Sequence, residues 1–151
     1  MHSPLVITNS ELRTWQTCKR KWYLSYALGF ASDPSKEPVT GVMHLGSSVH
    51  LALEAWYGYG IDPLRALDWI YSQDIFLAPG EEGALEKELV LAKVMTEGYC
   101  DWAAAEGIDA GLEILGCEVT VEHELEIGGQ RVVLRGKLDQ LARRKSDGAL
   151  F

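Results

Sequence analysis

The chain has 151 residues, of which 47% are hydrophobic and 24% are charged, as in a globular protein with room for one core. Its apolar runs are only a few residues long, which excludes a membrane-spanning helix. The first residues lack the basic stretch and apolar core of a signal peptide, so we expect a cytoplasmic protein. The three cysteines, Cys18, Cys100 and Cys117, are odd in number and far apart, which argues against a disulfide framework and a self-contained zinc site.

The net charge of −8 is unevenly distributed along the chain. Residues 1–30 carry four cations against one acid, a local charge of +3 (4 − 1), and residues 131–145 carry six against one, a local +5 (6 − 1). The acids concentrate in residues 81–126, where thirteen stand against two lysines. Two basic segments therefore flank an acidic middle, which is compatible with one basic face.

An amphipathic helix is expected at the start of the chain. Thr8-Asn9-Ser10-Glu11 has the form of a capping box, and Gly29 supplies a stop. Apolar residues recur between them at helical spacings: Leu12, Trp15, Trp22 and Tyr26. The other face carries basic residues: Lys19, Arg20 and Lys21.

Three more helices are expected after a loop at residues 31–41. The second helix starts at Val42 and ends at Gly58 and Gly60. Asp62-Pro63 opens a third helix, which runs to about Phe76. After a break at Ala78-Pro79-Gly80, acidic residues from Glu81 start a fourth helix that ends near Gly107.

From Leu115 the apolar period changes from 3.6 to 2, which predicts a strand to Ile127 with one buried and one wet face. Gly128-Gly129 predicts a tight hairpin, and the return strand runs from Gln130 to about Arg143. A second turn at Asp147-Gly148 leads into Ala149-Leu150-Phe151, the beginning of a third strand. Two full strands for four helices suggest a fold interrupted in its third strand; a natural domain of two and a half strands is the alternative.

Two places in the sequence are suited to a metal ion. Gly46, His50 and Glu54 follow each other at four-residue spacing on one helix face, where His50 and Glu54 either share a metal or form a surface pair, and Gly46 suggests a close approach to the backbone. Asp139 is unusual in a strand, after a glycine at 136 that also suggests a close approach or a bulge. A carboxylate there suits a hard cation, with a plain salt bridge as the alternative.

Three segments, in this order, resemble motifs of the RecB-like PD-(D/E)XK nucleases, in particular their CRISPR-associated and phage exonuclease-like branch. They are the following: Cys18-Lys19-Arg20-Lys21-Trp22-Tyr23-Leu24, Leu45-Gly46-Ser47-Ser48-Val49-His50-Leu51-Ala52-Leu53-Glu54 and Leu134-Arg135-Gly136-Lys137-Leu138-Asp139. They are moderately specific singly and strong jointly, and they cover nearly the whole chain.

The resemblance implies an α+β, restriction-endonuclease-like fold in which N-terminal helices pack on a mixed sheet that begins with an antiparallel hairpin. Residues 1–151 would form a single incomplete nuclease domain, with a helical part at 1–107 and the start of the catalytic sheet at 112–151. His50 and Asp139 would be the catalytic ligands of Mg²⁺ or Mn²⁺. Side chains that would contact DNA are Lys19, Arg20, Arg135 and Lys137.

The family's next elements, a strand with D/E-x-K and a helix with Q-x-x-x-Y, are not in the sequence, so we expect these 151 residues alone to be inactive. Cys18 stands where some members place one ligand of a [4Fe–4S] cluster. The implied function is that of a Mg²⁺-dependent deoxyribonuclease, an exonuclease of recombination, repair or phage DNA metabolism. The alternative is a non-catalytic DNA-binding or scaffolding module of the same fold. DNA is the implied partner, and the sequence indicates no protein partner.

Overall fold

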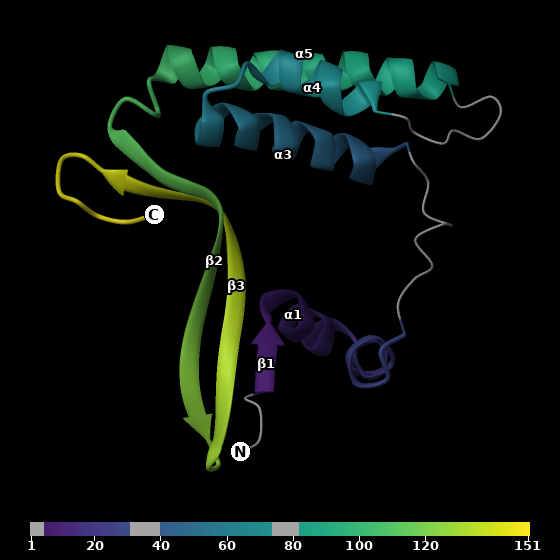
Figure 1. The fold of residues 1–151 in the computed structure, drawn as a ribbon, viewed down its shortest axis with the longest axis vertical. Helices are drawn as coiled ribbons and strands as arrows, with labels where there is room; N and C mark the ends of the chain where they lie inside the picture. Colours follow the sequence, from purple (N-terminus) through teal and green to yellow (C-terminus); the bar gives the residue numbers. More distant parts are fainter. Residues whose placement is uncertain (1–4, 31–39, 74–81) are drawn as a thin grey trace. The chain divides into compact units, whose positions relative to one another are not determined.

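The computed structural model describes residues 5–30, 40–73 and 82–151 (Figure 1). Their elements are, in order, β1 (Leu5–Thr8), α1 (Asn9–Thr17), α2 (Lys19–Trp22), the π-helix η1 (Tyr23–Ala27), α3 (Val42–Tyr59), α4 (Pro63–Ser72), α5 (Glu82–Glu106), β2 (Leu112–Ile127) and β3 (Gln130–Arg144). Most of the expected 31–41 loop, the region of Phe76, the break at residues 78–80 and Glu81 lie outside the described residues. The fold is α+β, as predicted.

The chain divides into two compact units, which are described separately. The hairpin unit contains Met1–Glu37 and Val119–Leu138, and the helical unit contains Pro38–Glu118 and Asp139–Phe151. None of the helices among the described residues is long and apolar enough to span a membrane.

The sheet of three strands has the order β1-β3-β2, with β3 in the middle. Gly128 and Gly129 have φ angles of 60° and 80°, so the predicted hairpin turn is confirmed. Strand β1 runs parallel to β3, with Leu5 opposite Val132 and Thr8 opposite Arg135. The sequence analysis missed β1 because four residues are too few to establish an alternating pattern.

The opening helix is interrupted, so the prediction of one continuous helix is wrong. Its start is confirmed, because the Thr8 hydroxyl accepts a hydrogen bond from the Glu11 backbone N–H at 3.1 Å. Cys18 then takes an extended conformation (φ −156°, ψ 102°), and its sulfur caps α2 by accepting from the Lys21 N–H at 3.4 Å. The apolar stripe persists across the break, since the Trp15 and Trp22 rings meet edge to face at 4.9 Å.

Strand β2 departs from the predicted pattern of one buried and one wet face. His123, expected on the buried face, is exposed, and Val121 and Ile127 of the same face are 41% and 59% exposed. Glu118, expected on the wet face, is partly buried. The φ angle of 56° at Glu118 accounts for the partial burial of this residue, because a left-handed residue interrupts the alternation of side chains along a strand.

The start of a third strand after the second turn is confirmed. Gly148 has a φ angle of 74°, and Leu150 forms an antiparallel bridge with Arg143. Ala142 and Phe151 exchange two backbone hydrogen bonds of 3.1 and 2.9 Å.

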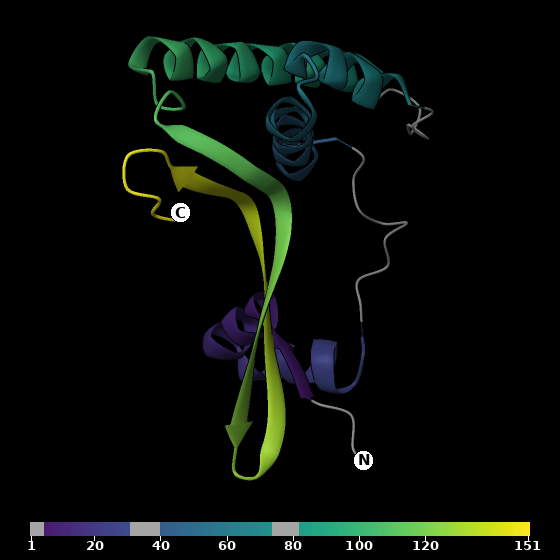
Figure 2. The ribbon, with the colours of Figure 1, turned by 60° about the vertical axis from the view of Figure 1, so that its left-hand side comes forward.

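In the helical unit α3, α4 and α5 pack against one another (Figures 1 and 2). The α3 helix ends at Gly60 (φ 66°) as predicted, whereas Gly58 lies inside it and is not a stop. The Asp62 carboxylate caps α4 by accepting from the N–H groups of residues 64 and 65, at 2.9 and 3.0 Å. The buried hydrophobic cluster between these helices contains Ala52, Leu67, Tyr71 and Ala92.

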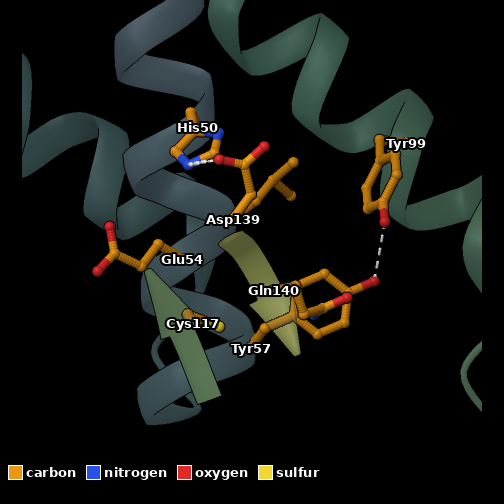
Figure 3. Close-up of a pocket in the computed structure, with 8 residues that line it drawn as sticks. His50, Glu54, Tyr57, Tyr99, Cys117, Asp139 and Gln140 are labelled. Carbon is orange, nitrogen blue, oxygen red and sulfur yellow. Dashed lines mark hydrogen bonds and ion pairs between the residues drawn. The ribbon is translucent and has the colours of Figure 1, made fainter. Parts of the chain in front are cut away.

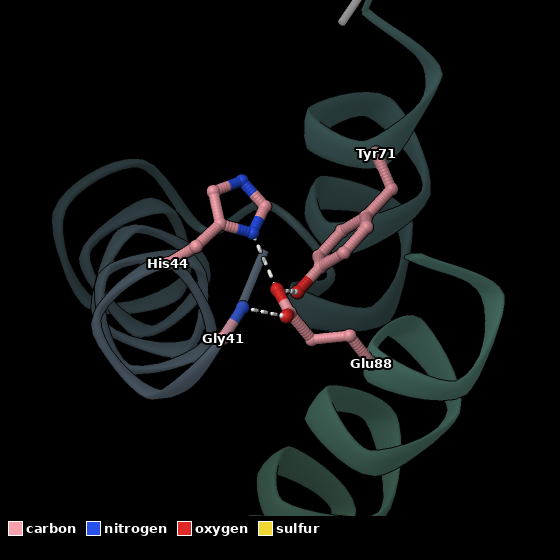
Figure 4. Close-up of polar contacts among 4 residues, drawn as sticks. All are labelled: Gly41, His44, Tyr71 and Glu88. Carbon is pink, nitrogen blue, oxygen red and sulfur yellow. Dashed lines mark hydrogen bonds and ion pairs between the residues drawn. The ribbon is translucent and has the colours of Figure 1, made fainter. Parts of the chain in front are cut away.

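One buried carboxylate, Glu88 of α5, connects the three helices (Figure 4). It accepts hydrogen bonds from the Gly41 N–H at 2.5 Å and from the Tyr71 hydroxyl at 2.9 Å, and it pairs with the ring of His44. Gly41 is the N-cap of α3, so this carboxylate satisfies a backbone donor that the helix itself leaves without a partner.

The surroundings of Glu88 favour its charged form. Burial alone would raise its pKa, but the hydrogen bonds from Gly41, His44 and Tyr71 outweigh burial and lower it. Burial also raises the pKa of Tyr71 to about 12, with a further contribution from Glu88. Tyr71 is therefore a neutral donor and Glu88 a charged acceptor at neutral pH.

Replacing Glu88 by glutamine should lower the free energy of unfolding by about 2 kcal/mol at pH 7, because hydrogen bonds to a charged acceptor become hydrogen bonds to a neutral one. A carboxylate whose pKa is lowered by folding stabilises the protein above its ordinary value of 4.5, and this contribution disappears as the pH falls through the folded-state pKa. The difference between the wild type and Glu88→Gln should therefore shrink in acid. Urea unfolding followed by circular dichroism measures it; Glu86→Gln, an exposed neighbour on α5, is the control.

Candidate metal centre

Three side chains from three elements converge in the helical unit: His50 of α3, Glu118 of β2 and Asp139 of β3 (Figure 3 draws the first and the last). The Nε2 atom of His50 lies 2.7 Å from Oε1 of Glu118 and 3.9 Å from Oδ1 of Asp139. One ligand atom from each residue lies within 4.8 Å of those of the other two. The structure thus brings together the predicted pair His50 and Asp139 and adds Glu118, which the sequence analysis missed.

Local backbone geometry positions each of the three groups. His50 lies beside the apolar stripe of α3, which leaves its side chain 44% exposed. Glu118 is the one non-glycine residue with a positive φ among those described, and its side chain is only 18% exposed. A residue in this region costs about 1–3 kcal/mol and persists where the surroundings hold it. Asp139 lies on the central strand of the sheet with an 82% exposed side chain.

The donor set fits a hard divalent cation. The two carboxylates suit Mg²⁺ or Mn²⁺, whereas the imidazole is a softer ligand that a transition-metal ion accepts more readily than Mg²⁺. An octahedral ion with ligands at about 2.1 Å separates neighbouring ligands by about 3.0 Å and opposite ones by about 4.2 Å. The distances from Nε2 of His50, 2.7 and 3.9 Å, come close to these two values. The exposed Asp139 leaves a side open for water and substrate.

A cavity of about 190 Å³ adjoins this cluster and is partly lined by Tyr57 and Tyr99 (Figure 3). The Tyr57 hydroxyl donates to the Asp109 carboxylate at 2.8 Å and lies 3.0 Å from the Tyr99 hydroxyl. Burial, with the hydrogen bonds to Tyr99 and Asp109, raises the pKa of Tyr57 far above its ordinary range. The Tyr57 hydroxyl is therefore neutral and adds no negative charge beside the cluster.

Glu54 lines the same cavity as His50 and Asp139 but is not one of the converging ligands, so the expected sharing of a metal with His50, or a surface pair with it, is not found. Glu54 points away from His50 and Asp139 in Figure 3. Burial, and then the charge of Glu54, raise the pKa of Cys117, which disfavours a thiolate ligand here.

The two glycines that were expected to mark a close approach do not do so among the described residues. A Cβ at Gly46 would have no atom within 4 Å beyond its own helical neighbours. A Cβ at Gly136 would meet Val121 at an ordinary 3.5 Å.

The expected DNA-contacting residues all lie in the hairpin unit and belong to two groups. Lys19 and Arg20 are exposed on α2. Arg135 and Lys137 lie on β3, where Arg135 pairs with Glu122 at 2.6 Å. Cys18 is exposed, with its sulfur at the start of α2.

Comparison with known proteins gave one finding. The family model of the PD-(D/E)XK nuclease superfamily matches residues 6–151, almost the entire chain. No curated protein matches it significantly.

Glu118→Gln should weaken Mn²⁺ binding at least about tenfold, because the cluster loses one of its two carboxylates and even residues behind metal ligands are worth about 10–100-fold in affinity. Glu54→Gln removes a carboxylate one helical turn from His50 and should leave the affinity unchanged. Titration followed by electron paramagnetic resonance of free Mn²⁺ measures both. Equal losses in the two variants would show that general negative charge, and not the cluster, attracts the ion.

Proposed function

Since the chain belongs to the PD-(D/E)XK nuclease superfamily, we propose that it is a metal-dependent deoxyribonuclease in which His50, Glu118 and Asp139 hold a Mg²⁺ or Mn²⁺ ion. The convergence of these three side chains supports the proposal most strongly, because His50 and Asp139 occupy the positions at which the sequence motifs predict metal ligands.

The residues of the cluster have distinct tasks in phosphodiester hydrolysis. A divalent ion bound here would lower the pKa of a coordinated water molecule and stabilise the negative charge that develops on the phosphate. The two carboxylates would neutralise the ion's charge, and the imidazole would hold it against α3. The open side at Asp139 gives a phosphate oxygen access to the same centre.

The family's D/E-x-K motif contributes a further carboxylate and a lysine that stabilises charge in the transition state. Residues 1–151 contain no Asp or Glu followed two positions later by Lys. We therefore propose that these 151 residues bind the ion but do not hydrolyse DNA by themselves.

The finer assignments are also proposals. The three ordered motifs support a RecB-like exonuclease of recombination, repair or phage DNA metabolism that acts in the cytoplasm. A [4Fe–4S] cluster at Cys18 would need three further thiolates. Burial is the largest of the causes that raise the pKa of Cys100 and of Cys117, which disfavours both as thiolate ligands.

A non-catalytic DNA-binding module is the second candidate, favoured by the basic residues at 19–21 and 131–145. It predicts DNA binding that depends on salt and needs no divalent ion. The nuclease proposal instead predicts cleavage that EDTA abolishes.

In a chain that also carries the D/E-x-K strand, Asp139→Asn should reduce cleavage of linear DNA by at least about a hundredfold, since it removes a direct ligand. Residues 1–151 alone should show no cleavage above background. Gel assays with Mg²⁺ and with EDTA measure both, and Asp68→Asn, an acid on α4, is the control. Cleavage by Asp139→Asn at the wild-type rate would refute the proposal.

A further inference from the structure

We propose that the surface of α1, α2 and η1 binds single-stranded DNA, with bases stacked on Trp15 and Tyr23 and phosphates held by the surrounding basic side chains. The choice of DNA rests on the proposed function. The surface belongs to the hairpin unit, and binding there requires no metal ion.

The charge of this surface is not compensated. Four exposed cations lie on α1 and α2: Arg13, Lys19, Arg20 and Lys21. Within the described part of the chain none of them forms an ion pair. The nearest acid in sequence, Glu11, accepts a hydrogen bond from the indole N–H of Trp22 at 3.0 Å.

The second basic segment differs in this respect. Its four arginines all have carboxylate partners: Arg131 with Glu124 at 3.5 Å, Arg135 with Glu122 at 2.6 Å, Arg143 with Glu113 at 3.3 Å and Arg144 with Asp147 at 2.9 Å. Anionic ligands would have to compete with these carboxylates. The opening helices therefore offer phosphate the better electrostatic site.

Exposed aromatic rings alternate with the cations on the same surface. Trp15 is 42% exposed and Tyr23 is 52% exposed. The ammonium of Lys19 lies 5.3 Å from the centre of the Trp15 ring, and Tyr23 follows Lys19 by one helical turn. Lys19 thus contacts the Trp15 ring on one side of the break at Cys18 and lies one turn from the exposed Tyr23 on the other.

The ring of Trp15 is also held in place by its contact with Trp22. The two rings meet edge to face at 4.9 Å, and Glu11 fixes the Trp22 indole. The two tryptophans and their neighbours border an apolar hollow of about 250 Å³. A fixed ring with accessible area loses little conformational entropy when a base stacks on it.

This combination selects single strands over duplexes. Stacking on aromatic side chains requires free base faces, which a duplex hides between its own base pairs, whereas cations along the surface follow the phosphates of either form. An apolar protein partner fits less well, because it would bury four cations without partners. Sequence preference should be weak, since every base has a face that can stack.

Fluorescence anisotropy of residues 1–151 with a labelled oligothymidine of about 20 nucleotides, longer than the usual site of one such platform, tests the proposal in EDTA. Tyr23→Ala should weaken binding about tenfold, and Tyr23→Phe should not, because it keeps the ring. Tyr59→Ala removes a 75% exposed ring of α3 and serves as the control. Lys19→Gln should reduce the salt dependence, the slope of log K against log salt, by about 0.7.

Three results would overturn the proposal: no binding of the oligothymidine, equal binding by Tyr23→Ala and the wild type, or equal or tighter binding of a blunt duplex. These outcomes are independent of the metal centre, because EDTA is present throughout. If the wild type did not bind Mn²⁺ at all, this would contradict the nuclease proposal but would not affect the proposed single-strand site.

Discussion

The carboxylate of Glu88 accepts three donors inside the helical unit and thereby fixes where α3 begins. Gly41, the cap of that helix, and His44 in its first turn both bind this one side chain, while Tyr71 connects it to α4. Because a helix is a rigid spacer, fixing the first turn also fixes the later ones. The position of His50, less than two turns beyond His44, therefore depends on a side chain of another helix.

The cluster of His50, Glu118 and Asp139 depends equally on an unfavourable backbone conformation. A regular β2 would direct Glu118 and its neighbours alternately to two faces. The left-handed angle at Glu118 breaks this order and allows its carboxylate to reach His50. A non-glycine residue in this conformation needs support from its surroundings, and the hydrogen bond of 2.7 Å to the imidazole contributes to it.

The sequence predicted correctly those features that depend on interactions between residues close together in the chain. Helix caps at Thr8 and Asp62 and the Gly128-Gly129 turn depend on neighbours in sequence and were predicted correctly. Long amphipathic patterns likewise placed α3 and α5. The break at Cys18 and the left-handed Glu118 have no local pattern, because alternation and helical spacing continue through both. Motif resemblance selected His50 and Asp139, whereas Glu118 could be found only from coordinates.

The same distinction applies to charge. A sum over residues 131–145 gave the more basic of the two segments, but pairing across the hairpin and at the last turn neutralises its arginines. Pairing across strands depends on register, which a count of residues does not contain. The cations of the less charged opening segment form no ion pair within the described residues.

The hydrogen bond between His50 and Glu118 also determines what must happen when a cation enters. A carboxylate accepts only from a protonated nitrogen, so Nε2 carries the hydrogen in this arrangement. A cation bound here would need the lone pair of the same nitrogen, and the hydrogen would then have to leave or reappear at Nδ1. The ring is nearly half exposed, so water can carry that hydrogen from one edge to the other. The Nε2 atom of His50 thus holds the carboxylate of Glu118 by a hydrogen bond in this structure, and the same atom would bind a cation.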